Sequence, residues 1–204
     1  NVGLAYIASA IHRAGFDIEI LDIDAFRYDE ETIDRFLRTK RYDVVGIGDL
    51  VSHYKWIKTI AHVIKTHRPE VPVIVGNTCG TSIPRLLMEK TDVDIAVLSE
   101  GDETVVELLR FLDSNKPLDE VMGVAFKRDG NVIQNCGRKV IEPLDSIPFP
   151  NYDLFEIGVY LEKSKWHVNG PEMIKVPFEE IVAMPVVTAR GCPYRCTFCY
   201  HAFQ

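Results

Sequence analysis

Short apolar runs alternate with amphipathic patterns through the first half of the chain, and this alternation constrains the fold more than any other feature. Val- and Ile-rich runs suited to strands buried on both faces lie at residues 43–48, 71–75 and 94–98. Each run is followed by a helix pattern, and these patterns lie at residues 54–67, 82–90 and 103–114. Continuous apolar runs are typical of parallel strands, which need crossover connections. The sequence therefore predicts an α/β fold with a doubly wound parallel sheet.

The two ends of the chain add further expected elements. Residues 2–14 have helical spacing with Gly15 as a stop, residues 16–23 alternate like a strand, and residues 29–39 form a helical face. A doubly wound domain usually opens with a strand, whereas this chain opens with a helix pattern. We therefore expect a fragment cut at both ends. The apolar segment 181–188 is predicted to be a strand that could fill the vacated position.

A change of rhythm after Pro117 predicts a small addition to the sheet. Residues 121–127 and 131–136 resemble two strands joined at Asp129-Gly130, a strong hairpin signal. Three prolines between residues 143 and 151 then predict an extended linker. We expect an α/β domain at residues 1–142, a connecting region at 143–180 and the start of a second domain at 181–204.

Composition excludes two classes of protein. The 204 residues carry a net charge of -7, which argues against a general nucleic-acid binder. No apolar run approaches the length of about 18 residues typical of a membrane span. Five cysteines, three of them within eight positions, suit a metal site better than a disulfide framework. We expect a cytoplasmic protein in a reducing compartment.

The cysteine-rich loop carries the strongest chemical signal. Cys192, Cys196 and Cys199 have spacings of four and three, and thiolates are the usual ligands of iron–sulfur clusters. Three ligands leave one iron open to bind a cofactor or substrate. Zinc is the alternative, but it needs a fourth ligand, for which His201 is the nearby candidate.

Residues 188–199, Thr-Ala-Arg-Gly-Cys-Pro-Tyr-Arg-Cys-Thr-Phe-Cys, resemble the signature loop of the radical S-adenosylmethionine superfamily. The resemblance implies a 4Fe-4S cluster on the three cysteines, with S-adenosylmethionine on the fourth iron and its cleavage to a 5′-deoxyadenosyl radical. It places Phe198 near the adenine, although simple packing beneath the loop would also explain this ring. It also implies the start of a β/α barrel.

Three loops follow predicted strands and open helices, so they should meet at one edge of the sheet, where ligands of such folds bind. Glycines there permit close approach, while turn and cap roles explain any one loop equally well. The candidate cofactor-binding residues in these loops are Gly48, Asp49, Leu50, Ser52, Gly76, Asn77, Thr78, Glu100, Gly101 and Thr104.

Residues 2–8, 72–76, 100–102 and the linker at 144–155 resemble the Rossmann-like, or flavodoxin-like, cobalamin-binding domain that precedes many radical S-adenosylmethionine domains. The loop after Gly76 departs from that family, which commonly has a second glycine and a Pro-His pair. There is no Asp-x-His-x-x-Gly element, and His53 follows Asp49 at a different spacing. The resemblance therefore implies cobalamin without a protein histidine on cobalt.

Together these resemblances imply an enzyme that, at full length, transfers a methyl group or performs an oxidative cyclisation on a small-molecule substrate, with flavodoxin or ferredoxin as electron donor. Two alternatives remain. The front domain could bind no cobalamin, or it could be a flavodoxin-like electron-transfer module whose cysteines hold a simple redox centre.

Overall fold

The chain forms two compact units in this computed structural model, which describes residues 2–167, 176–192, 194 and 196–199. One, the sheet unit, comprises Glu31–Pro148 with Gly191–Gln204. The other, the helical unit, comprises Asn1–Glu30 with Phe149–Arg190. Among the described residues, no helix combines the length and apolarity that crossing a membrane requires.

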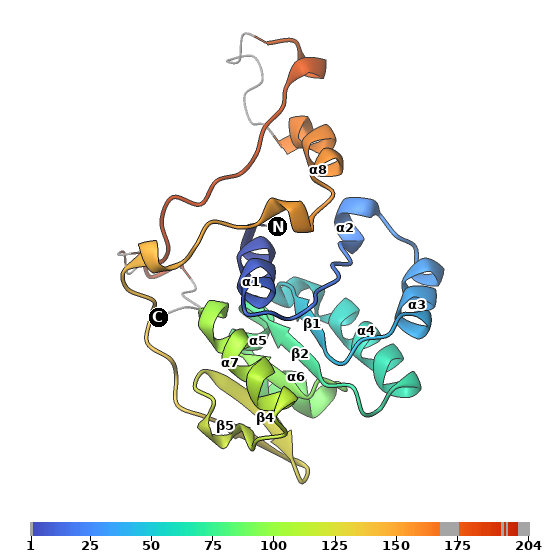
Figure 1. Ribbon diagram of the computed structural model, residues 1–204, viewed down its shortest axis with the longest axis vertical. Helices are drawn as coiled ribbons and strands as arrows, with labels where there is room; N and C mark the ends of the chain where they lie inside the picture. Colours follow the sequence, from blue (N-terminus) through green and yellow to red (C-terminus); the bar gives the residue numbers. More distant parts are fainter. Residues whose placement is uncertain (1, 168–175, 193, 195, 200–204) are drawn as a thin grey trace. The chain divides into compact units, whose positions relative to one another are not determined.

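A mixed five-stranded sheet forms the centre of the sheet unit, in the order β1-β2-β3-β4-β5 (Figure 1). The first three strands are parallel, and the last two are antiparallel. Their bounds are β1 Val45–Gly48, β2 Val73–Gly76, β3 Ile95–Val97, β4 Val124–Arg128 and β5 Asn131–Gln134. The α/β class and the parallel strands expected from the apolar runs are confirmed.

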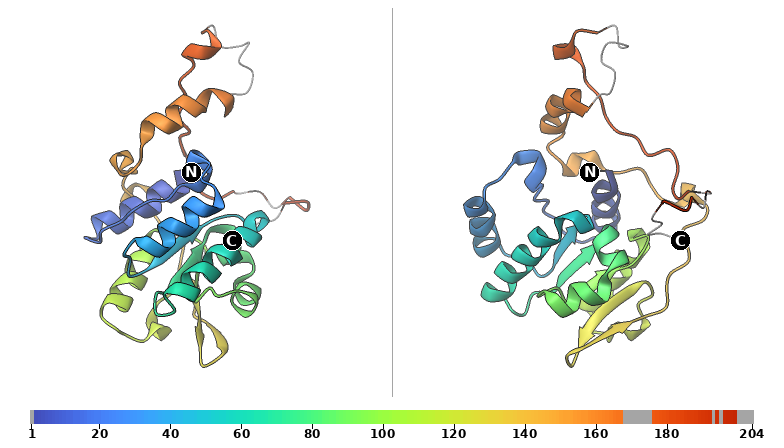
Figure 2. Two further views of the ribbon diagram at one scale, coloured as in Figure 1. Left: turned by 90° about the vertical axis from the view of Figure 1, so that its right-hand side faces the viewer. Right: turned by 180° about the vertical axis from the view of Figure 1, so that it is seen from behind.

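Both faces of the sheet are covered by helices (Figures 1 and 2). On one face, Leu108 of α7 (Asp102–Asp113) packs with Ile74, Ile95 and Phe126 in a buried apolar cluster. The helices on the other face are α4 (Tyr54–His67), α5 (Asn77–Ser82) and α6 (Pro84–Lys90). Burial on both faces explains why these strands read as uninterrupted Val and Ile runs.

The helix expected at residues 82–90 is α6 (Pro84–Lys90), and a separate short helix, α5 (Asn77–Ser82), precedes it. The break lies at Ile83, whose φ of -135° and ψ of 41° are not helical, and Pro84 occupies the first turn of α6. Proline disfavours helical geometry in the residue before it and is well accommodated at a helix start. The loop expected at residues 76–81 is wrong in part, because most of it forms α5.

The hairpin prediction is confirmed. β4 and β5 pair from Ala125 with Gln134 to Arg128 with Asn131. The turn residues Asp129 and Gly130 have φ of 51° and 78°. Two consecutive positive φ values are typical of the type I′ turn, whose twist matches that of the flanking strands.

The strand expected at residues 16–23 is wrong, because no described residue pairs with residues 16–22 and α2 begins at Ile23. The strand expected at 181–188 is wrong for the same reason: within the described residues it joins no sheet. Alternating apolar residues favour an extended chain, but a strand also requires a neighbour to complete its hydrogen bonds.

The helical unit contains α1 (Val2–Arg13), α2 (Ile23–Phe26) and α8 (Ile157–Ser164), whereas α3 (Glu30–Thr39) lies almost wholly in the sheet unit. The expected helix at residues 2–14 is confirmed, with Gly15 at φ 92° as its stop. Segments distant in sequence meet in the helical unit: the Tyr160 hydroxyl donates to Asp22 Oδ2 at 2.7 Å, and Asn151 N–H donates to Ser9 Oγ at 2.6 Å. Burial and the Asp22 carboxylate raise the pKa of Tyr160.

Candidate functional site

The three candidate loops lie at the carboxyl ends of β1, β2 and β3, at one edge of the sheet. Gly48 and Gly76 are register partners in the parallel pair β1–β2, so the first two loops start side by side. A shallow surface hollow bounded by Lys58, His62 and Asp92 lies near the amino end of β3, and no candidate residue lines it.

Helix α5, which forms most of the second loop, is hydrogen-bonded to the first and third loops. The Thr78 hydroxyl accepts a hydrogen bond from Val51 N–H of the first loop at 3.3 Å, and the Thr81 hydroxyl accepts one from Ser99 N–H of the third at 3.0 Å. Thr81 was not among the candidates. Its only sequence signal is its position three residues after Thr78, which places both hydroxyls on similar faces of a helix.

The ends of β1 and β2 leave open space beside their glycines. A Cβ atom added at Gly48 or Gly76 would meet no other atom within 4 Å. The neighbouring Leu50 is 47% exposed, although it is large and apolar, and Ser52 is exposed as well. Open backbone beside apolar and polar side chains fits a large cofactor that combines a broad ring with many polar substituents, such as cobalamin.

Polar groups of the first two loops are held by local hydrogen bonds. Asp49 Oδ1 accepts from Leu50 N–H at 2.7 Å and lies 2.7 Å from His53 Nδ1. Asn77 has a φ of 59°, and its side-chain oxygen accepts from Thr78 N–H at 2.7 Å. These contacts orient the loops from within.

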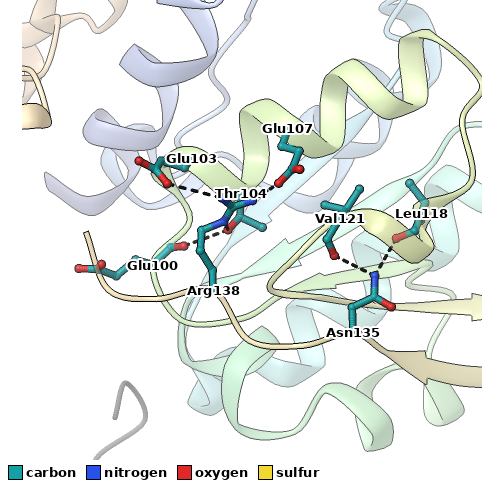
Figure 3. Close-up of polar contacts among 8 residues, drawn as sticks. All are labelled: Glu100, Glu103, Thr104, Glu107, Leu118, Val121, Asn135 and Arg138. Carbon is teal, nitrogen blue, oxygen red and sulfur yellow. Dashed lines mark hydrogen bonds and ion pairs between the residues drawn. The ribbon is translucent and has the colours of Figure 1, made fainter. Parts of the chain in front are cut away.

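The third loop is held from outside, by the chain that follows the hairpin (Figure 3). Thr104 is fully buried, and its hydroxyl donates to Glu100 O at 3.3 Å and accepts from Arg138 Nε at 3.0 Å. The Glu100 carboxylate accepts from Ile141 N–H at 2.7 Å. Gly101 forms the N-terminal cap position of α7. Arg138 has no sequence signal that could have identified it.

Cys79 lies under this edge and is fully buried. Burial, with a smaller contribution from the Asp49 carboxylate, raises the pKa of the Cys79 thiol to about 11. The thiol is therefore protonated and unreactive at neutral pH, which is the behaviour of a small buried core residue.

Cys192, Cys196 and Cys199 are exposed, and Cys199 N–H donates to Cys196 O at 3.0 Å. In the described part of the chain, no three His, Cys, Asp or Glu side chains gather as a metal site. The structure thus does not bring the three thiols together, although three closely spaced thiolates are the donor set that iron–sulfur clusters use. Phe198 is 91% exposed, and His201 lies outside the described residues.

Comparison with known proteins gives a family match. The family model described as the B12 binding domain matches residues 1–109. An uncharacterised methyltransferase of Pyrococcus horikoshii is 32% identical over 204 residues, which are 100% of this chain and 41% of the relative. Anaerobic magnesium-protoporphyrin IX monomethyl ester cyclase of Rubrivivax gelatinosus is 28% identical over 96% of this chain and 34% of the cyclase.

A similar fold occurs in a solved structure, that of the cobalamin-dependent S-adenosylmethionine radical enzyme OxsB with aqua-cobalamin and S-adenosylmethionine bound. The TM-score is 0.63 at 20% identity, over 78% of this chain and 22% of OxsB. At this identity, the likeness concerns the fold alone. The chain spans less than half the length of each of these proteins.

Proposed function

The chain belongs to the B12-binding domain family, and from this premise we propose that it is the cobalamin-binding part and cluster loop of a radical S-adenosylmethionine enzyme. The observation that carries the proposal is the edge formed by the three loops, where two strands end in glycines with open space beside them. Ligands of α/β sheets bind at this edge.

Each loop has a role in cobalamin binding. The backbone at Gly48 and Gly76 lies close to the cofactor, and Leu50 supplies an apolar contact. Polar substituents bind to Asp49, Ser52, Asn77 and Thr78 and to the backbone of Gly101. Glu100 and Thr104 contribute by holding the third loop, through Ile141 N–H and Arg138. Because the chain has no Asp-x-His-x-x-Gly element, we retain the expectation that cobalt has no protein histidine ligand.

Cys192, Cys196 and Cys199 are the protein ligands of a 4Fe-4S cluster, which supplies reductive cleavage of S-adenosylmethionine. The thiols are exposed and lie within eight residues, so they can converge on one cluster. Phe198 contacts the adenine of S-adenosylmethionine, and the exposure of its ring supports this role. The segment 181–204 is then the start of the catalytic domain, residues 1–142 are the cobalamin module, and residues 143–180 connect them.

The complete enzyme catalyses methyl transfer or an oxidative cyclisation on a small molecule. Relatives whose names carry a methyltransferase and a cyclase activity support these two classes equally. A flavodoxin or ferredoxin supplies the electron, and the reaction takes place in the cytoplasm.

Cobalamin titration tests the front domain. We expect hydroxocobalamin to bind the 204-residue chain at one site, with a change in its visible absorbance, and Gly76→Val to abolish binding by filling the open space. Gly158→Val is the matched control, since Gly158 is also open but lies in α8, outside the three loops. Absence of binding to the unchanged chain would favour a front domain that holds no cobalamin.

Anaerobic iron–sulfur reconstitution tests the cysteines. We expect the reduced chain to give a four-iron paramagnetic resonance signal that S-adenosylmethionine perturbs and that Cys196→Ala removes. Cys136→Ala should leave the signal intact, because Cys136 is exposed but lies outside the loop. A signal unaffected by S-adenosylmethionine would favour the electron-transfer alternative.

A further inference from the structure

The chain that leaves the hairpin, residues 135–141, is a return segment fixed at its start by backbone groups of the sheet unit. Asn135 Nδ2 donates to Leu118 O at 2.7 Å and to Val121 O at 2.8 Å (Figure 3). Gly123 N–H donates to Cys136 O at 2.8 Å. The return segment therefore starts from a defined position.

Arg138 connects this segment to the first two turns of α7. Its guanidinium donates to Thr104 Oγ1 at 3.0 Å, pairs with Glu107 and lies 3.5 Å from Glu103 (Figure 3). The Arg138 side chain is only 19% exposed, so the hydrogen bonds are largely shielded from water. Loss of this guanidinium would leave partly buried acceptors without their donor, which is costly.

The return segment also reaches the third candidate loop directly. Ile141 N–H donates to Glu100 Oε2 at 2.7 Å. At its other end the loop is held by Thr81, through Ser99 N–H. Ser99 has a φ of 61°, in a region that residues other than glycine rarely adopt, so its conformation depends on contacts that hold it in place.

We propose that Arg138 and Glu100 are positioning residues of the cofactor edge, and this inference rests on the proposed cobalamin function. They hold the backbone of residues 99–104 in the shape that the cofactor meets, without Arg138 touching the cofactor. Thr104, fully buried and bonded to both Arg138 and Glu100 O, transmits this constraint. The hairpin and return segment thereby act on cofactor affinity from outside the binding edge.

Arg138→Met tests this in the 204-residue chain. We expect about tenfold weaker hydroxocobalamin binding, the range found when coupled residues outside a site are changed, and faster amide hydrogen exchange confined to residues 99–104. Arg138→Lys, which keeps a charge for Glu107 but not the guanidinium geometry at Thr104, should restore part of the affinity. Arg128→Met is the matched control, since Arg128 lies at the end of β4 and pairs with Asp119 at 2.6 Å, away from the third loop.

The proposal is overturned if Arg138→Met leaves both affinity and exchange at residues 99–104 unchanged, or if Arg128→Met weakens binding equally. Should Arg138→Met not fold, Glu100→Gln replaces it. We expect it to weaken hydroxocobalamin binding less than Arg138→Met, because the amide oxygen is a weaker acceptor for Ile141 N–H. If the unchanged chain binds no cobalamin, the proposed function fails, while the exchange measurement still decides whether Arg138 positions the loop.

Discussion

At the scale of single residues, the shape of the cofactor edge depends on how closely α5 approaches the sheet. A Cβ atom at Gly80 would lie 2.5 Å from Val75 O and 2.8 Å from Val97 O. Both contacts are with backbone atoms, which cannot move aside as a flexible side chain could. Only glycine therefore allows α5 to place Thr78 and Thr81 against their neighbouring loops.

Gly80→Ala should destabilise the sheet unit by about 2–3 kcal/mol, because the added methyl group overpacks the contact between α5 and the strand ends. Chemical denaturation followed by circular dichroism measures this loss. Gly158→Ala is the control: Gly158 lies in α8 with nothing within 4 Å of an added Cβ. Equal stability of the two variants would contradict the close approach of α5.

Cys79 predicts a dependence of stability on alkaline pH. Burial raises the pKa of its thiol from 9.0 to about 11, so between these values the unfolded chain releases the proton while the folded chain retains it. The free energy of unfolding should therefore fall as pH rises from about 9 to about 11, and the thiol should cause no change in it below pH 9. Urea titrations across that range measure the effect.

The comparison is with Cys79→Ala, which should show a shallower decline over the same pH range. Lys127, whose pKa is lowered by burial, titrates in both proteins, so its contribution cancels in the difference. The pKa of Tyr54 is raised by burial in both proteins and by the Cys79 thiolate only in the unchanged chain, so the difference includes this coupling as well. Identical pH profiles would show that the thiol titrates alike in the folded and unfolded chains.

At the scale of elements, local signals predicted structure well where one or two residues decide the backbone. The helix expected at residues 54–67 is α4, and the turn expected at Asp129-Gly130 joins β4 to β5. The next expected helix is α6, which starts at Pro84 and is separated from α5 because the residue before a proline avoids helical geometry. The strands predicted at residues 16–23 and 181–188 do not form, because neither an alternating pattern nor an apolar run tells whether a partner strand is present.

Gly130→Ala should destabilise the hairpin by about 1–2 kcal/mol, since its φ of 78° is unfavourable for residues with a Cβ atom. No steric contact contributes, because an added Cβ meets nothing within 4 Å. Gly137→Ala has equally open surroundings and no positive φ, and should be neutral or slightly stabilising. Thermal unfolding measures the stability of the two variants. Equal destabilisation of both would show that the positive φ at the turn is not the cause.

At the scale of the whole molecule, cofactor binding and stability are linked. Cobalamin at about 100 times its dissociation constant should raise the free energy of unfolding by about 2.7 kcal/mol. Hydrogen exchange should show the first protection at residues 48–53, 76–81 and 99–104. Protection around Lys58 and His62 instead would place the ligand at the hollow near the amino end of β3.

The sequence by itself determined the α/β class, the hairpin, the glycines at the ends of the first two strands and the cysteine spacing, because each follows from the conformational preference or chemistry of neighbouring residues. The tertiary structure decided which extended segments became strands, how α5 joins the loops, and that Arg138 contacts Thr104 across 34 positions. Such contacts are absent from local patterns, since they depend on where folding brings distant backbone and side-chain groups together.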